Sequence, residues 1–154
     1  MDINGREFYT RAARERIRQG DLFAEPAFVV PVMTRGRAYG SISKAIQARG
    51  IVIPDLKLRE TAVETHNGKT VVFLAFWDDT TPYSNAHVTA CVEHAMGAAS
   101  NARVPFLAIP LLGGKEWEKY LGAMEFGVEQ AEQTFDVTGF NPVEVSFVTL
   151  DTVT

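Results

Sequence analysis

Two short segments of this sequence have the composition of phosphate-binding loops. The first, from Thr34 to Gly40, contains Arg35, Gly36 and Arg37. Glycine lets backbone N–H groups approach a phosphate closely, and arginine pairs with its oxygens in a bidentate way. A helix beginning directly after the segment would add a favourable dipole. The segment therefore predicts an anion site, although an ordinary strand-to-helix turn with solvated arginines fits the same residues.

The second segment, Leu112 to Trp117, also leads from an apolar run into a helical pattern. Its paired glycines, Gly113 and Gly114, fit a concave arrangement of N–H groups around a second phosphate. A tight turn with Trp117 as a core residue is the alternative. Glu116 is the one catalytic candidate here, but a carboxylate at a helix start is favoured in its charged form, so an ordinary helix-start role is preferred.

Two other groups could hold a cation. His87, Cys91 and His94 are spaced to share one face of a helix, as ligands of a transition metal would. Cys91 falls within an apolar stripe and no further ligand motif accompanies the three, so packing is the favoured interpretation. Asp78 and Asp79 follow an apolar run, where capping of a loop is favoured over cation binding. We expect no metal and no cofactor.

These residues need a sheet to position them. Apolar runs predict strands, and apolar residues at helical spacing predict helices. Asn67-Gly68 between two strand-like runs, 61–65 and 70–76, predicts a β-hairpin. Residues 5–19 are rich in arginine and fit either a short helix or, over 14–18, an edge strand. The expected strands are 28–33, 70–76, 105–110 and 143–150, and the expected helices are 41–48, 85–99 and 116–134. This alternation predicts an α/β fold with a mixed sheet covered on both faces.

The charge distribution and the composition of the chain disfavour some classes of function. Residues 1–60 carry 11 Lys/Arg against 7 Asp/Glu, and residues 61–154 carry 4 against 12, for a net charge of −4. This charge distribution disfavours binding of nucleic acid over a broad surface. It is compatible with binding of a small anion by residues 1–60. Cys91 is the single cysteine, and no apolar run is long enough to span a membrane. We expect one domain over 1–154, in the cytoplasm, without membrane association.

The order of motifs resembles the macro domain family. Gly20-Asp21-Leu22 followed by an apolar strand looks like the opening of that family, and 35–42 stands where its first glycine-rich loop belongs. Residues 106–117 are similar to its second phosphate loop, most closely in the antitoxin-type branch with ADP-ribosylglycohydrolase members. The resemblance covers about residues 13–150.

The resemblance implies a three-layer α/β/α fold with a mixed central sheet that binds ADP-ribose or a related adenine nucleotide. Asp21 would accept a hydrogen bond from the adenine amino group, and the two loops would enclose the diphosphate and the distal ribose. The implied ligand-binding residues are Asp21, Leu22, Thr34, Arg35, Gly36, Arg37, Ala38, Tyr39, Gly113, Gly114 and Lys115.

Three departures bear on catalysis. Thr34 stands where the family has the asparagine that orders the distal ribose, and the second loop is shorter than usual. Hydrolases of the antitoxin-type branch use a lysine in the first loop, whereas Arg35 or Arg37 stands here, and a guanidinium is not a nucleophilic amine. We therefore expect binding without fast turnover. The alternatives are a glycohydrolase acting on modified protein or nucleic acid, and a degenerate module for protein contact.

Overall fold

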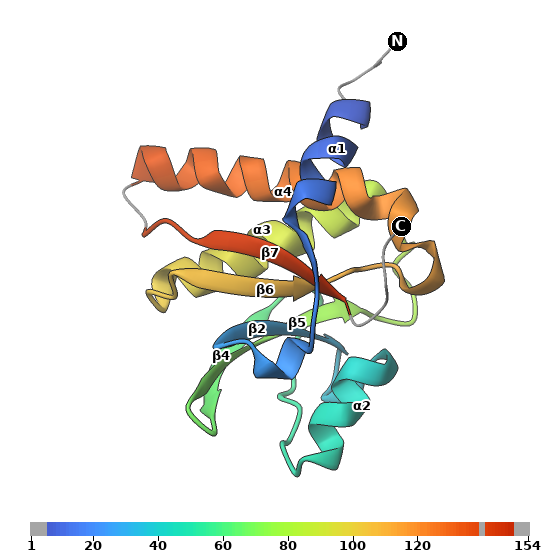
Figure 1. Ribbon diagram of the computed structural model, residues 1–154. Helices are drawn as coiled ribbons and strands as arrows, with labels where there is room; N and C mark the ends of the chain where they lie inside the picture. Colours follow the sequence, from blue (N-terminus) through green and yellow to red (C-terminus); the bar gives the residue numbers. More distant parts are fainter. Residues whose placement is uncertain (1–5, 139–140, 150–154) are drawn as a thin grey trace.

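The computed structural model describes residues 6–138 and 141–149 of the chain (Figure 1). The strands are β1 (Ile17–Gln19), β2 (Ala27–Met33), β3 (Arg37–Ala38), β4 (Thr61–His66), β5 (Lys69–Trp77), β6 (Phe106–Pro110) and β7 (Glu144–Thr149). The helices are α1 (Arg6–Arg16), α2 (Gly40–Ala48), α3 (Asn85–Asn101) and α4 (Trp117–Thr138), with short 3-10 helices η2 (Leu22–Ala24) and η3 (Gly114–Glu116).

The strands form one mixed sheet in the order β1-β7-β6-β2-β5-β4, and β3 pairs with the end of β2. Strands β1, β7, β6, β2 and β5 are parallel, whereas β4 is antiparallel to β5. The turn between β4 and β5 is formed by Asn67 and Gly68, whose φ angles are 53° and 77°. The predicted hairpin and the predicted mixed sheet are therefore confirmed.

Strand β2 pairs with its two neighbours, β5 and β6, over very different lengths. It pairs with β5 along its whole length, from Ala27 opposite Thr70 to Met33 opposite Trp77, with a register shift after Val32. It pairs with β6 only at Phe28, opposite Ala108. Because β5 occupies one edge of β2, the antiparallel strand β3 must take the other edge at Val32 and Met33. The hydrogen-bonded contact between β2 and β6 thus ends well before the carboxyl end of β2.

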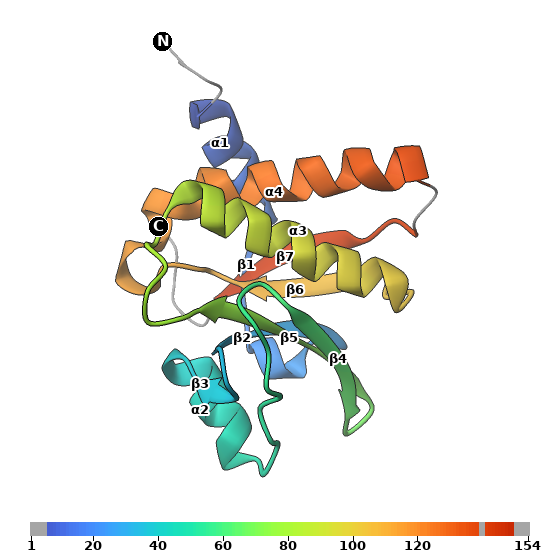
Figure 2. The same ribbon diagram turned by 180° about the vertical axis from the view of Figure 1, so that it is seen from behind.

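Helices cover both faces of the sheet, as the two views show (Figures 1 and 2). Helices α1, α3 and α4 lie on one face, where their core contains Ala13, Val92 and Met124 packed with strand residues such as Val72 and Phe147. Helix α2 and the segment after it lie on the other face, where Ile46, Ile53 and Leu56 pack on residues such as Val30 and Phe73. The predicted three-layer α/β/α arrangement is confirmed.

Most predicted elements are present with small shifts at their ends. Ser84 caps α3 by accepting a hydrogen bond from the His87 amide at 3.1 Å, as its position before the helical pattern predicts. The arginine-rich segment contains a helix, α1, and then a short edge strand, β1, so each of the two interpretations is right for part of it. The last position of the predicted strand 143–150 lies outside the described residues.

One expectation about the first loop is wrong. The segment 34–40 is not a continuous loop, because Arg37 and Ala38 form strand β3 and pair with β2.

Within the described residues, no helix is both long and apolar enough to cross a membrane.

Candidate functional site

The candidate residues gather at one edge of the sheet. Because β2, β5 and β6 are parallel, the segments that follow them all leave from their carboxyl ends. These segments are 34–40, 78–84 and 111–116. Ligands of open α/β sheets bind at this edge, so the fold brings both predicted phosphate loops to the expected side.

Several amides of the first loop already have partners inside the protein. The Thr34 amide donates to the Trp77 carbonyl at 3.0 Å, and the Arg35 amide donates to the Leu56 carbonyl at 3.3 Å. The Tyr39 amide donates to the Ser43 hydroxyl at 2.5 Å. A Cβ atom on Gly36 would lie 3.1 Å from the Ile53 carbonyl oxygen, so this turn is packed against the chain rather than open. These amides are not available to a phosphate without rearrangement.

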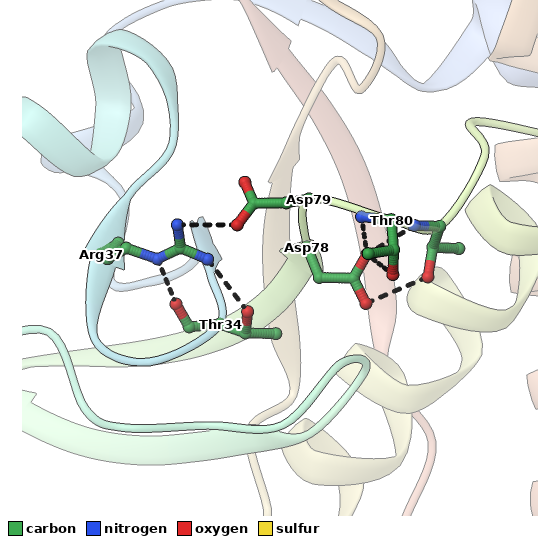
Figure 3. A network of polar contacts seen from close by, with 6 residues as sticks. Thr34, Arg37, Asp78, Asp79 and Thr80 are labelled. Carbon is green, nitrogen blue, oxygen red and sulfur yellow. Dashed lines mark hydrogen bonds and ion pairs between the residues drawn. The ribbon is translucent and has the colours of Figure 1, made fainter.

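The Arg37 side chain is also held internally. Its Nε donates to the Thr34 carbonyl at 2.9 Å and a terminal nitrogen lies 3.4 Å from the Thr34 hydroxyl. The other terminal nitrogen forms an ion pair with Asp79 at 3.1 Å (Figure 3). Arg35 is exposed, with a left-handed φ of 65°. The two arginines predicted to attract an anion are therefore in different states: Arg37 has a counter-ion and Arg35 projects from the turn.

Asp78 caps the loop that follows β5. One carboxylate oxygen accepts from the amides of Thr80 and Thr81 at 2.9 and 2.6 Å, and both threonine hydroxyls donate to the carboxylate (Figure 3). The backbone bonds from Thr81 and Thr80 lower the pKa of Asp78 to about 2. The loop-capping interpretation of Asp78 is confirmed.

The second loop is more open. Gly113 and Gly114 have φ angles of 112° and 58°, in the left-handed region that glycine adopts without strain. Gly114, Lys115 and Glu116 form η3, are all exposed and lead directly into α4. The first amides of a helix have no carbonyl partner within it, so those of Gly114 and Lys115 point out of the start of η3. A helix start of this kind favours an anion.

Gly113 packs against an aromatic cluster that the sequence did not reveal. A Cβ atom at Gly113 would lie 2.8 Å from Cδ2 of Tyr120, so the loop approaches that ring too closely for any side chain. The Tyr120 ring lies 4.5 Å from the Tyr83 ring, centroid to centroid, and Tyr83 lies 5.3 Å from Phe76. Tyr39 of the first loop lies 5.6 Å from Phe76. The cluster Tyr39–Phe76–Tyr83–Tyr120 thus connects the two loops beneath the edge of the sheet.

Tyr83 stands out within this aromatic cluster. Its hydroxyl is buried and has no hydrogen-bond partner among the described residues. Burial, together with the neighbouring phenols of Tyr39 and Tyr120, raises the pKa of Tyr83 far above its ordinary value. The hydroxyl therefore stays protonated and can donate a hydrogen bond to a bound molecule. A buried polar group without a partner is costly and marks a position worth testing for function.

Asp21 and Leu22 lie apart from these loops. Asp21 is exposed, and its Oδ1 accepts from the Phe23 amide at 3.0 Å, which caps η2. Leu22 is only 6% exposed and its side chain belongs to the core on the α2 face. Asp21 lines a cavity with residues of η2, α2 and the β4–β5 turn, and no residue of 34–40 or 113–116 is among those lining it. The structure thus does not bring Asp21 into one cavity with the two loops.

The possible metal site on α3 is a packing arrangement. Nδ1 of His87 accepts from Arg59 Nε at 3.1 Å, and its Nε2 hydrogen-bonds the Phe76 carbonyl. Both ring nitrogens are therefore in use, and Cys91 is buried against the same ring. His94 is exposed on the helix surface. Among the residues that the structure describes, no three His, Cys, Asp or Glu side chains are grouped so as to hold a metal.

Comparisons by sequence find no relative: no protein-family model matches the chain, and neither does any curated protein. Solved structures do match. The macrodomain of Mycobacterium tuberculosis DarG superposes with a TM-score of 0.58 at 15% identity, over 86% of this chain and 96% of that one. The macrodomain of Thermus aquaticus DarG gives 0.52 at 16%, over 85% and 96%.

Two further solved structures superpose on the chain. A point mutant of an Oceanobacillus iheyensis macrodomain gives a TM-score of 0.57 at 12% identity, over 86% of this chain and 83% of that one. An alphavirus protein described as P23pro-zbd gives 0.60 at 17%, over 88% of this chain, which spans 22% of the alphavirus chain. At such low identities the likeness is one of fold. The chain has the macrodomain fold, as its motif order predicts.

Proposed function

We propose that this chain, which has the macrodomain fold, binds ADP-ribose or a related adenine nucleotide at the carboxyl edge of its sheet. The observation that carries the proposal is the second loop. Gly113 and Gly114 turn the chain in the left-handed region and present the start of η3 and α4 at this edge. Helix starts reached through glycine are a general way to bind phosphate.

The diphosphate would rest on the second loop rather than equally on both. The amides of Gly114 and Lys115 are at the start of η3, whereas those of Thr34, Arg35 and Tyr39 have internal partners. The exposed cations Arg35 and Lys115 would add charge. The Tyr83 hydroxyl is buried without a partner among the described residues, and it would donate to the ligand once binding uncovers it.

Asp21 would contact the adenine amino group. Its side chain is exposed and only Oδ1 is engaged by the Phe23 amide among the described residues. The second carboxylate oxygen can then accept from an amino group. Since this assignment comes from the position of Asp21 in the macro domain pattern, it needs its own test.

The first loop favours a second candidate function. The Arg37–Asp79 ion pair and the bonded amides of Thr34 and Arg35 close the loop on itself. A macrodomain fold closed in this way would suit protein contact without nucleotide binding. The two candidates differ in one measurable property, which is affinity for ADP-ribose.

Titration calorimetry with ADP-ribose, AMP and NAD tests the proposal. Saturable binding of ADP-ribose is expected, and Asp21→Ala should weaken it by about 1–3 kcal/mol, the range for a hydrogen bond to a charged group. Asp55→Ala, an exposed aspartate outside the proposed contacts, is the control. No binding of any of the three nucleotides would favour the protein-contact function. Equal affinity of Asp21→Ala and the parent would remove the adenine role alone.

A further inference from the structure

The cavity that Asp21 lines has the features of a second binding site, and no residue of the segments 34–40 and 113–116 lines it. It lies on the α2 face, between η2, the end of α2 and the turn before β5. Its volume is about 260 Å³. Sites for drug-sized ligands occupy roughly 300–1,000 Å³, so this cavity suits a smaller molecule, such as one with a single ring.

The floor of the cavity is apolar and consists of buried side chains. Phe28, Ile46 and Val71 contribute to it and are 3%, 1% and 1% exposed. Phe23 stands beside the floor with its ring edge-on to Phe28, at 5.4 Å between centroids. A floor of this kind favours an apolar body, because burial of apolar surface stabilises the bound state.

Two cations stand at the cavity and are held in place without being neutralised. The Arg49 guanidinium lies 4.0 Å above the centre of the Phe23 ring. The Lys69 ammonium donates to the Ala24 carbonyl at 3.1 Å. Both side chains line the cavity. Neither an aromatic face nor a carbonyl removes a full positive charge.

Arg49 and Lys69 differ from several arginines of the chain in that they form no ion pair among the described residues. Carboxylates lie within 3.6 Å of the guanidinium nitrogens of four arginines, Arg14, Arg16, Arg18 and Arg37. Over residues 6–138 and 141–149, no carboxylate is within 4.0 Å of the charged nitrogens of Arg49 or Lys69. Two unpaired cations beside a concave apolar floor attract an anion.

We propose that this cavity binds a small carboxylate that carries one ring or a branched chain. The apolar body would lie on Phe28, Ile46 and Val71, and the carboxylate would lie between Arg49 and Lys69. Arginine matches the planar geometry of a carboxylate. A single negative charge is preferred over the double charge of a phosphate monoester, because Asp21 lines the same cavity and would repel the second charge.

Amide NMR titrations with benzoate, benzyl alcohol and phenyl phosphate test this proposal on the parent protein. Benzoate should shift the amides of Phe23, Asn67 and Lys69, and benzyl alcohol, which has no charge, should bind more weakly. Arg49→Gln and Lys69→Gln should each weaken benzoate binding about ten- to a hundredfold, the usual worth of a charge-assisted bond. Lys44→Gln, an exposed lysine of α2 that does not line the cavity, should leave it unchanged.

Four outcomes would overturn the proposal. They are an absence of benzoate shifts at these amides, equal binding of benzyl alcohol and benzoate, tighter binding of phenyl phosphate, and unchanged benzoate affinity in both variants. Displacement of benzoate by ADP-ribose would show instead that the cavity is part of one shared site. Since ADP-ribose binding is measured separately, failure of the carboxylate site leaves the nucleotide proposal unaffected.

Discussion

Arg37 and Asp79 form an ion pair of 3.1 Å across 42 positions of the chain. The pair joins the turn after β2 to the loop after β5 at the carboxyl edge of the sheet (Figure 3). An arginine that was predicted to attract a ligand anion therefore already has an internal counter-ion. If the diphosphate of the proposed ligand also contacts Arg37, it would compete with Asp79 for the same guanidinium.

Removing that competitor should strengthen nucleotide binding. The side chains of Arg37 and Asp79 are 39% and 62% exposed, so their pairing is worth between about 0 and 1 kcal/mol. We expect Asp79→Asn to raise the affinity for ADP-ribose about two- to fivefold, more at low salt than at high salt. Calorimetry at two ionic strengths measures this, with Glu93→Gln on α3 as the charge-matched control. Unchanged or weaker binding by Asp79→Asn would show that Arg37 is not used.

Tyr83→Phe should separate binding from stability. Removal of a buried hydroxyl without a partner costs the folded protein nothing, so the melting temperature should stay the same or rise. If the hydroxyl donates to the nucleotide, the affinity for ADP-ribose should fall about two- to tenfold. Tyr9→Phe on α1 is the control for both measurements. A lower melting temperature with unchanged affinity would contradict the assigned role.

Two helical glycines should respond in opposite ways to alanine. A Cβ atom on Gly127 of α4 would lie 2.7 Å from the Thr89 carbonyl oxygen and 2.9 Å from Cβ of Val92, both on α3. Gly127→Ala should therefore destabilise the fold by about 1–3 kcal/mol through overpacking. Apart from the adjacent backbone of α3, no atom of the described residues lies within 4 Å of a Cβ on Gly97, so Gly97→Ala should stabilise α3 by about 0.5–1 kcal/mol. Denaturant unfolding compares them, and a loss of stability in both would refute the packing argument.

His87 should make stability depend on pH. Burial lowers the pKa of His87 below 6.5; the positive charge of Arg59 acts in the same direction, and the Phe76 hydrogen bond opposes both. The unfolded chain therefore takes up its proton first as the pH falls. The stability that His87 contributes is complete above about pH 6.5 and is lost as the pH falls through the lower, folded-state pKa.

Melting temperatures between about pH 8 and pH 5 test this dependence. The melting temperature of the parent should fall as the pH is lowered through this range. The His87→Gln variant should be less stable than the parent at neutral pH, but its melting temperature should fall less over the same range. His94→Gln, an exposed histidine on the same helix, should follow the parent. A His87→Gln variant with the slope of the parent would disprove the link.

Catalysis is expected to be slow or absent. Glu116 is exposed in η3, with its amide bonded to the Gly113 carbonyl at 3.0 Å, as expected of a helix-start residue. Incubation with ADP-ribosylated peptide and ADP-ribosylated DNA, followed by chromatography of released ADP-ribose, should show no release above background. Robust release that Glu116→Gln abolishes would instead establish a glycohydrolase.

Local sequence was sufficient for most of the secondary structure. The doubly apolar run of β5, the Asn67-Gly68 turn and the Ser84 cap each act through neighbouring residues, so their signals are visible along the chain. Short-range hydrogen bonds and the period of apolar residues carry the information on secondary structure. The macrodomain fold was indicated separately, by the resemblance of Gly20-Asp21-Leu22 and of the segments 35–42 and 106–117 to the macro domain family, and the structural comparisons bear it out.

The state of each candidate residue was decided by tertiary contacts. The sequence presents Arg35 and Arg37 as equivalent, but only Arg37 meets Asp79 once β2 and β5 lie side by side. It presents Tyr83 as a residue before a helix, although packing of α3 against α4 brings it onto Tyr120. Ion pairs and buried hydroxyls depend on groups that are distant in the chain, and no local pattern specifies which groups folding will bring within hydrogen-bond distance.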